Sequence, residues 1–267
     1  ILNWQKGKTI KGYLLGGFAE RSYIILRGQQ SEDKTLMGKE MRVRTLWSYQ
    51  LITLSLRKGS FEEYKSRLYQ FPLPQDNSDM LFKQAPKICY LADLHLESTR
   101  NLFSLFIAVT EIWADCSSWI IQGGKHHFRE APWDSKSEWN RINCKLLLFE
   151  KCLGSRESLN KQNLDAFSAL GQGSIYCYIH LAILTARILI HRNYMPFIPL
   201  DSNGPKGPHE KFPELDPAPS CWWKDSARTV FRSSKEISLI YNECKKRNMY
   251  SYSTFAGFVA LTAASTL

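Results

Sequence analysis

Most of the short motifs that mark enzymes and metal sites are missing from this chain. Its seven cysteines form no Cys-x-x-Cys pair, and the two closest lie eight residues apart. It also has no Gly-x-Gly-x-x-Gly, P-loop, His-Glu-x-x-His or Gly-x-Ser-x-Gly sequence. These absences exclude the usual zinc cluster, nucleotide-binding loop, zinc-protease helix and serine-hydrolase turn. Because the cysteine number is odd and no Asn-x-Ser/Thr acceptor is present, we predict reduced, intracellular thiols rather than a disulfide framework.

Carboxylate pairs suited to catalysis are equally scarce. No two aspartates are adjacent, and Asp76 and Asp79 lie in a predicted turn. Helical enzymes that bind diphosphates need clustered aspartates to hold magnesium. General acid–base catalysis needs carboxyl groups that are placed together. We therefore predict that the chain is not an enzyme and that its own residues hold no cofactor and no metal.

Positive charge is in excess, but it forms no extended basic run. The chain has 35 basic and 25 acidic residues and a net charge of +10, of which +7 lies in residues 1–70. The longest basic run, residues 245–247, has only three members. Because the basic residues of 1–70 are interleaved with apolar ones at helical spacing, they predict a solvated helix face rather than a direct nucleic-acid groove.

Helical periodicity is abundant, and the alternation typical of strands is almost absent. Apolar residues recur at helical spacing in six segments: 8–27, 39–57, 90–121, 162–193, 222–247 and 254–267. Ser60 with Glu63 and Ser135 with Glu138 form two capping boxes, the second opening a helix that runs to about residue 153. The pair at 123–124, both glycines, predicts the end of a helix. The predicted fold class is all-α, a multi-helix domain whose longest helix covers 162–193.

A proline-rich stretch separates the last two predicted helices from the rest. Seven of the eleven prolines fall in residues 196–219, which predicts an extended internal loop because no helix can cross it. The apolar stretches 102–114 and 175–190 fall short of a membrane span and contain ionisable residues, so we predict buried core helices and no membrane partner. The chain begins at Ile1 and ends within an apolar pattern. We therefore expect a fragment of a longer protein, with residues 1–267 forming one domain.

One seam of polar residues stands out on the helix predicted at 162–193. Its members, spaced 3, 4, 3 and 4 residues apart, are Cys177, His180, Leu184, Arg187 and His191. The other faces of this helix are apolar, so the polar groups need partners inside the fold. The pattern favours an internal polar network, with a pocket for a small anionic effector or a metal site as alternatives. The candidate effector site or internal polar network consists of the polar members of this seam, Cys177, His180, Arg187 and His191, together with Arg192.

Arg187 is the costliest member of the seam to bury, because arginine stays charged at any ordinary pH. We expect its partner to be a carboxylate, a set of carbonyl groups or a bound anion.

Six blocks of residues, in this order, carry a resemblance to a known family: 17–21 followed by Leu26, 40–47, 131–134 with Phe149-Glu150, 178–181 with 189–197, Trp222-Trp223 with Ser226-Ala227, and 255–258. The most specific piece reads Leu-Ile-His-Arg-Asn-Tyr-Met-Pro-Phe at 189–197. With these blocks the chain resembles the fungal-specific transcription factor domain, the middle homology region of fungal binuclear zinc cluster transcription factors. The first two blocks are similar to the regulatory region of xylanolytic activators. The chain departs from the family at Ser22, at 26–29 and at Thr53-Leu54.

The resemblance implies an all-α regulatory domain of a nuclear transcription factor that controls transcription by RNA polymerase II. The six-cysteine zinc cluster that binds DNA in this family is absent from the 267 residues, so zinc and DNA binding are expected in a segment outside them. The implied partners are DNA through that cluster, a small-molecule effector, and the transcription machinery or intramolecular partners. The residues leave two alternatives: a helical small-molecule-binding protein or enzyme that uses the polar seam, and a membrane-associated helical protein.

Overall fold

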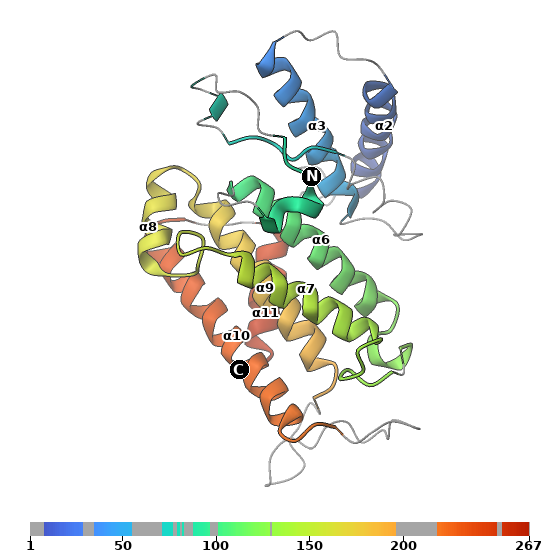
Figure 1. Cartoon of the computed structure of the whole chain (residues 1–267), viewed down its shortest axis with the longest axis vertical. Helices are drawn as coiled ribbons and strands as arrows, with labels where there is room; N and C mark the ends of the chain where they lie inside the picture. Colours follow the sequence, from blue (N-terminus) through green and yellow to red (C-terminus); the bar gives the residue numbers. More distant parts are fainter. Residues whose placement is uncertain are drawn as a thin grey trace. The chain divides into compact units, whose positions relative to one another are not determined.

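The computed structural model describes residues 8–28, 35–54, 71–76, 79–80, 82, 88–96, 101–128, 130–195, 218–249 and 253–266 (Figure 1). The chain divides into two compact units, Ile1–Thr110 and Glu111–Leu267. The single domain expected over residues 1–267 stays a prediction. The capping box at Ser60 and the proline-rich residues 196–217 lie outside the described residues.

The described residues are all-α, which confirms the predicted fold class. The α-helices are α2 (Thr9–Gly28), α3 (Leu36–Leu54), α6 (Leu102–Ile121), α7 (Glu138–Cys152), α8 (Lys161–Ala169), α9 (Gly173–Arg192), α10 (Trp222–Lys246) and α11 (Thr254–Ala264). Two 3-10 helices cover Leu91–Leu96 and Gly124–His126. Strand-like pairing in these residues is limited to an isolated bridge between Pro72 and Tyr90.

In the first unit, one face of α3 fixes a neighbouring loop. The indole of Trp47, which is 1% exposed, donates a hydrogen bond to the carbonyl oxygen of Pro72 at 2.7 Å. Earlier on the helix, Glu40 accepts the backbone N–H of Gln75 at 3.0 Å, and Arg44 donates to the carbonyl oxygen of Gln75 at 2.8 Å. Glu40 and Arg44 also form an ion pair at 2.8 Å. Because positions i, i+4 and i+7 share one face of a helix, these three side chains act together.

The helix predicted at 8–27 is confirmed as α2, but its apolar side chains are largely exposed. Leu14, Phe18 and Ile25 are 58%, 63% and 59% exposed. The helical period therefore predicts this element correctly, while the side chains that define the period do not form a core within the described part of the chain.

The predicted helical segment at 90–121 is confirmed as the 3-10 helix Leu91–Leu96 followed by α6. The apolar residues that define the helical period of this segment are all buried: Leu94, Leu102, Leu105, Ile112 and Trp119. Gly123 and Gly124 follow α6 with φ angles of 105° and 53°. Glycine adopts this left-handed conformation without strain, so the pair ends the helix as predicted.

Two helices, α6 and α9, are long and apolar enough to cross a membrane by length and composition. The prediction that these stretches fall short of a span is therefore wrong on length, because each helix extends beyond the apolar stretch from which it was predicted. Most of each helix is buried inside the fold: 67% of the most apolar 18 residues of α6, and 83% of those of α9. Core helices of soluble proteins pass the same test, so the two helices are weak evidence for a membrane span.

The start of α7 differs from the predicted capping box. Ser137 is the N-cap, and its hydroxyl accepts a hydrogen bond from the N–H of Asn140 at 3.1 Å. The prediction of Ser135 as the cap is therefore wrong; its carbonyl oxygen accepts a bond from the side chain of Asn140 at 3.4 Å. The predicted helix end is confirmed, because α7 ends at Cys152 with Leu153 as its C-cap.

The prediction of one helix over residues 162–193 is wrong, because α8 and α9 are separate. Gly171 has a φ angle of 71°, and its N–H donates to the carbonyl oxygen of Ser168 at 3.0 Å. The N–H of Gln172 donates to the carbonyl oxygen of Phe167 at 2.7 Å. These two bonds form a Schellman motif, which ends α8 and turns the chain. The longest described helix is α10, with 25 residues.

The last two predicted helices are confirmed as α10 and α11. Ala227, Val230 and Ile237 of α10 are buried as its amphipathic pattern predicts. The same apolar pattern predicts Phe231 on this side of the helix, but Phe231 is 50% exposed. One helical position is about 100° of rotation, so Phe231 lies past the edge of the buried face that includes Val230.

Candidate functional site

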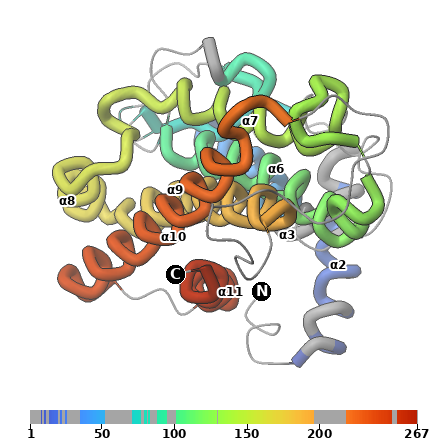
Figure 2. Tube along the Cα trace, turned by 90° about the horizontal axis from the view of Figure 1, so that it is seen from below, coloured from blue at the N-terminus to red at the C-terminus, as the bar shows by residue number. Residues whose placement is uncertain are grey.

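The helix that carries the polar seam, α9, is surrounded by other helices of the second unit. Helices α7, α8, α10 and α11 all pack against it, and α10 lies alongside it in both views (Figures 1 and 2). From Tyr176 to His191, every residue except Tyr178 is buried. A helix that is apolar nearly all round is expected in such a place. The polar side chains of its seam must therefore find partners inside the protein.

The first part of the seam joins α9 to two elements. The Sγ atoms of Cys177 and of Cys244 in α10 lie 3.5 Å apart. His180 Nε2 lies 3.0 Å from the carbonyl oxygen of Glu157, a residue of the segment between α7 and α8. The ring of Tyr176 packs edge-on against the imidazole of His180, with 4.7 Å between the ring centres. Because a carbonyl only accepts, Nε2 donates. Burial lowers the pKa of His180 to about 4, although the bond to Glu157 opposes this shift.

Arg187, in the middle of the seam, forms an ion pair with Glu150 of α7. The side chain of Arg187 is 10% exposed and that of Glu150 is 30% exposed. Burial lowers the pKa of the Arg187 guanidinium, the charge of Arg232 lowers it further, and Glu236 raises it. Arginine nevertheless stays protonated in proteins. A carboxylate, one of the three partners expected from the sequence, thus balances this charge.

The last part of the seam contacts α10 and the end of α11. His191 Nδ1 lies 2.8 Å from the hydroxyl of Ser226, and the indole of Trp139 packs edge-on against the imidazole at 5.0 Å. Burial, and then the charge of Arg187, lower the pKa of His191 to about 4. Arg192 donates to the hydroxyl of Ser265 at 2.9 Å.

The five candidate residues therefore contact five different partners, spread along the length of α9. These contacts supply what an internal polar network requires, a partner for each buried polar group. Within the described ranges, no three His, Cys, Asp or Glu side chains are grouped as a metal site would need. An effector pocket along the seam stays a prediction.

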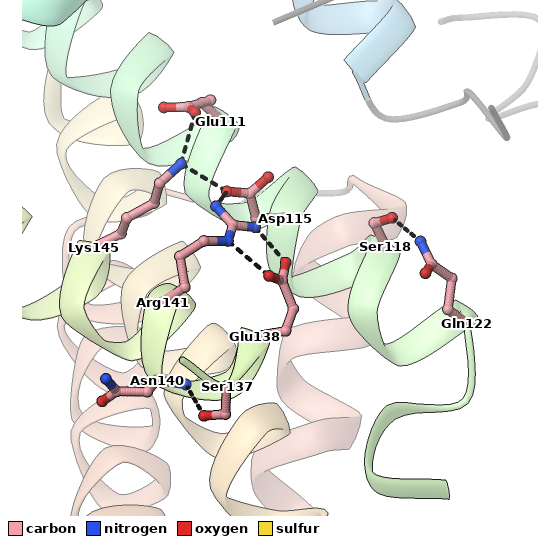
Figure 3. Close-up of polar contacts among 9 residues, drawn as sticks. All are labelled: Glu111, Asp115, Ser118, Gln122, Ser137, Glu138, Asn140, Arg141 and Lys145. Atoms are coloured by element: carbon pink, nitrogen blue, oxygen red, sulfur yellow. Dashed lines mark hydrogen bonds and ion pairs between the residues drawn. The ribbon is translucent and has the colours of Figure 1, made fainter. Parts of the chain in front are cut away.

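A second polar cluster, which was not predicted from the sequence, lies between α6 and α7 (Figure 3). Lys145 of α7 contacts Glu111 at 3.0 Å and Asp115 at 2.8 Å, both on α6. Arg141 contacts Asp115 at 3.1 Å and also pairs with Glu138. The sequence does contain a pattern that could have predicted the cluster. Two acids lie four residues apart on α6, and two bases lie four residues apart on α7. This pattern was missed because spacing within a helix does not say which helix packs against it.

Electrostatics of this cluster favour the charged forms. Burial opposes the charge of Lys145, but Glu111 and Asp115 outweigh it and raise the pKa of the ammonium group. The hydrogen bond with Glu138 and the charge of Asp115 raise the pKa of Arg141, against the effect of burial. The side chain of Asp115 is only 1% exposed. The cluster therefore joins α6 to α7 through ion pairs of Lys145 with Glu111 and Asp115 and of Arg141 with Asp115.

Aromatic rings gather where α9 ends and α10 begins. Trp222 packs against Trp133 and Trp139, each at 5.5 Å, and against Tyr194 at 6.1 Å. Trp223 packs against Trp133 at 5.6 Å. The place of Trp222-Trp223 directly after the proline-rich stretch predicts an anchor for the helix that follows. The ring contacts agree with this prediction, since edge-to-face pairs add to the energy of burial.

The chain is similar to a protein of Schizosaccharomyces pombe that is named as an uncharacterized transcriptional regulatory protein, with 25% identity over 206 residues. The match covers 75% of this chain and 28% of the relative, so the chain spans only about a quarter of that protein's length. No family model matches the chain. No solved structure matches it either.

Proposed function

We propose that this chain is a regulatory domain of a nuclear transcription factor of the fungal zinc cluster type, which controls transcription by RNA polymerase II. DNA binding, and the zinc it needs, would come from a cysteine-rich segment outside these residues, and the chain itself would be no enzyme. The similarity to a protein named as a transcriptional regulator supports a role in transcription. The finer assignment rests on the six sequence blocks.

The observation that carries this assignment is that blocks far apart in the sequence contact one another in the second unit. The rings of Trp133 and Trp222 lie 5.5 Å apart, and those of Tyr178 and Phe255 lie 4.5 Å apart. His191 Nδ1 lies 2.8 Å from the hydroxyl of Ser226. They join the third, fourth, fifth and sixth blocks. Residues that specify a fold are expected to meet in its core, and these contacts agree with that expectation for four of the six blocks.

The second block has a structural role in the first unit. Glu40, Arg44 and Trp47 are α3 residues whose side chains fix the loop that contains Pro72 and Gln75. The motif residues in both units thus hold helices and loops together. This supports a packed regulatory domain, which would act by contacts with an effector or with other parts of the same protein.

A reporter experiment tests the proposal. The chain is placed between an unrelated DNA-binding domain and an activating segment, and an inert linker of similar length replaces it in the reference fusion. We expect the chain to change reporter output several-fold relative to the linker. The matched control is Ile183→Asp, because Ile183 is 2% exposed and a buried charge unfolds a core. Output equal for chain, linker and control would overturn the proposal.

A second measurement tests the location of DNA binding. The positive charge of residues 1–70 is interleaved with apolar positions, and no basic run exceeds three residues. We therefore expect the isolated chain to bind DNA without sequence preference and only at low salt. Tight, salt-resistant binding to one sequence over a scrambled one would place DNA recognition inside the chain.

A further inference from the structure

Two cysteine sulfurs meet at the contact between α9 and α10. Cys177 and Cys244 are 67 residues apart in the sequence, yet their Sγ atoms lie 3.5 Å apart. Cys177 is buried, with 4% of its surface exposed, while Cys244 is partly exposed to solvent. A disulfide bond is about 2.05 Å long, so the two sulfurs need to approach by only about 1.5 Å to become bonded.

We propose that Cys177 and Cys244 form a dithiol modification site that reacts with low-molecular-weight disulfides, such as oxidised glutathione, and closes into an intramolecular disulfide between α9 and α10. The site goes beyond the transcriptional role and does not depend on it.

Cys244 is the residue that reacts first, because an external disulfide can reach it and cannot reach the buried Cys177. The hydrogen bond from the Cys177 thiol and the charge of Arg247 lower the pKa of Cys244 to about 7, although burial and Glu243 oppose them. The guanidinium of Arg247 is held in place by Asp165 at 2.7 Å and by Glu243 at 2.6 Å. A positive charge beside a partly exposed thiol is the setting in which cysteines are reactive.

Cys177 is suited to the second step. The hydrogen bond to Cys244 and burial both raise the pKa of Cys177, so it stays a thiol while Cys244 ionises. Once Cys244 carries an adduct, its negative charge is gone, and with it one reason for Cys177 to keep its proton. The sulfur of Cys177 then lies next to the Cys244 sulfur that it must attack.

The reaction balances in two exchange steps. The Cys244 thiolate attacks one sulfur of the small disulfide, a mixed disulfide forms, and one small thiolate leaves. Cys177 gives its proton to solvent and attacks the Cys244 sulfur, so that the bond to the second small thiolate breaks and the Cys177–Cys244 bond forms. The two protein thiols are oxidised, and one small disulfide is reduced to two thiols.

Oxidation would close a long covalent loop in the second unit. The loop runs from Cys177 in α9 to Cys244 in α10 and includes the proline-rich residues 196–219. Closing a loop of this length restricts the unfolded chain, so the oxidised protein should melt about 5–10 °C higher than the reduced protein. Thiol oxidation thereby becomes a way to stiffen the packing of α10 on α9.

The test uses the full chain with its two exposed cysteines, Cys144 and Cys221, replaced by serine to prevent unrelated exchange. The reduced protein is incubated with oxidised glutathione at neutral pH, digested with trypsin without reductant, and mapped by mass spectrometry. We expect a linked pair of peptides that contain Cys177 and Cys244, an intact mass lower by two hydrogens, and the rise in melting temperature, all reversed by dithiothreitol.

Single variants separate the two roles. Cys177→Ser should retain glutathione on Cys244 as an unresolved adduct, whereas Cys244→Ser should leave Cys177 free, and neither should show the rise in melting temperature. The matched control is Cys116→Ser, because Cys116 is buried against the carbonyl oxygen of Ala186 and should not take part. The proposal is overturned if Cys177 and Cys244 both stay free thiols, or if the adduct on Cys244 persists while Cys177 is present. The peptide map of the unmutated pair decides this even if a variant does not fold.

Discussion

Mild acid should destabilise the second unit through two buried histidines of α9. Burial is the main reason that the pKa values of His180 and His191 fall from the ordinary 6.5 to about 4. Between pH 6.5 and 4, the unfolded chain therefore binds more protons than the folded chain. Because protons favour the state that binds more of them, the free energy of unfolding is greatest above pH 6.5 and falls as the pH drops toward 4.

The magnitude follows from the two pKa values. Between pH 7.5 and pH 5.5, each histidine should lower the free energy of unfolding by about 1.4 kcal/mol, since it is about 90% protonated in the unfolded chain and still neutral in the fold. His180 and His191 together give about 3 kcal/mol. Below pH 4 the folded histidines also take up protons, so the loss levels off at about 3.4 kcal/mol for each.

Urea unfolding at pH 7.5 and pH 5.5, followed by tryptophan fluorescence, measures this loss. Six of the eight tryptophans lie in the second unit, so the signal reports mainly on that unit. His180→Gln and His191→Asn place an amide nitrogen near Nε2 and Nδ1 respectively and do not titrate in this window. Each variant should lose about half of the acid sensitivity, and the double variant nearly all of it. If the double variant is as acid-sensitive as the wild type, these histidines are not neutral and buried as argued.

Three further expectations concern the same unit. Glu150→Met should lower the free energy of unfolding by about 3 kcal/mol, because it leaves the buried Arg187 charge without this carboxylate. Arg187→Met should lower it by only about 1 kcal/mol, because Glu150 can be hydrated. Equal losses in chemical denaturation would contradict this difference. Ser137→Ala should lower the stability by about 1 kcal/mol because it removes the N-cap, and Ser135→Ala should lower it by less than about 0.5 kcal/mol. The reverse order in thermal melts would indicate that Ser135 is the N-cap, as the sequence predicted. Elemental analysis after dialysis should find far less than one zinc per chain, and about one zinc per chain would refute the expected absence of a metal site.

The helices were largely predictable because their apolar periods are long. The buried positions of α6 and α10 repeat over about four to five turns, and such patterns identify an element without knowledge of its neighbours. The break between α8 and α9 was missed, since Gly171 is flanked on both sides by good helical periodicity, and only its positive φ angle of 71° shows that the chain turns. The cap of α7 was misplaced because Ser135 and Ser137 both lie close to the helix start, and the sequence does not tell which hydroxyl reaches the free N–H.

The sequence predicts which residues share the seam but not which partners they contact. The spacing of Cys177, His180, Arg187 and His191 identifies a common seam because helical geometry is local. Their contacts depend on tertiary packing instead: Ser226 is 35 residues from His191, and Cys244 is 67 residues from Cys177. A carboxylate was one of the three partners expected for Arg187, and several acids could have met that need. Only the packing of α7 on α9 selects Glu150.

The polar seam has a consequence for how four helices pack around α9. Apolar surfaces attract one another without direction, so a helix that is apolar all round could accept its neighbours in several registers. Arg187 restricts the packing of α7 on α9, because its ion pair forms only in a register that places Glu150 beside it. His191 does the same for α10 through Ser226. Each such contact penalises alternative packings by the cost of an unsatisfied buried polar group, about 1–3 kcal/mol or more for a charge. Breaking one of these contacts would therefore favour the shift of a whole helix rather than of a single side chain.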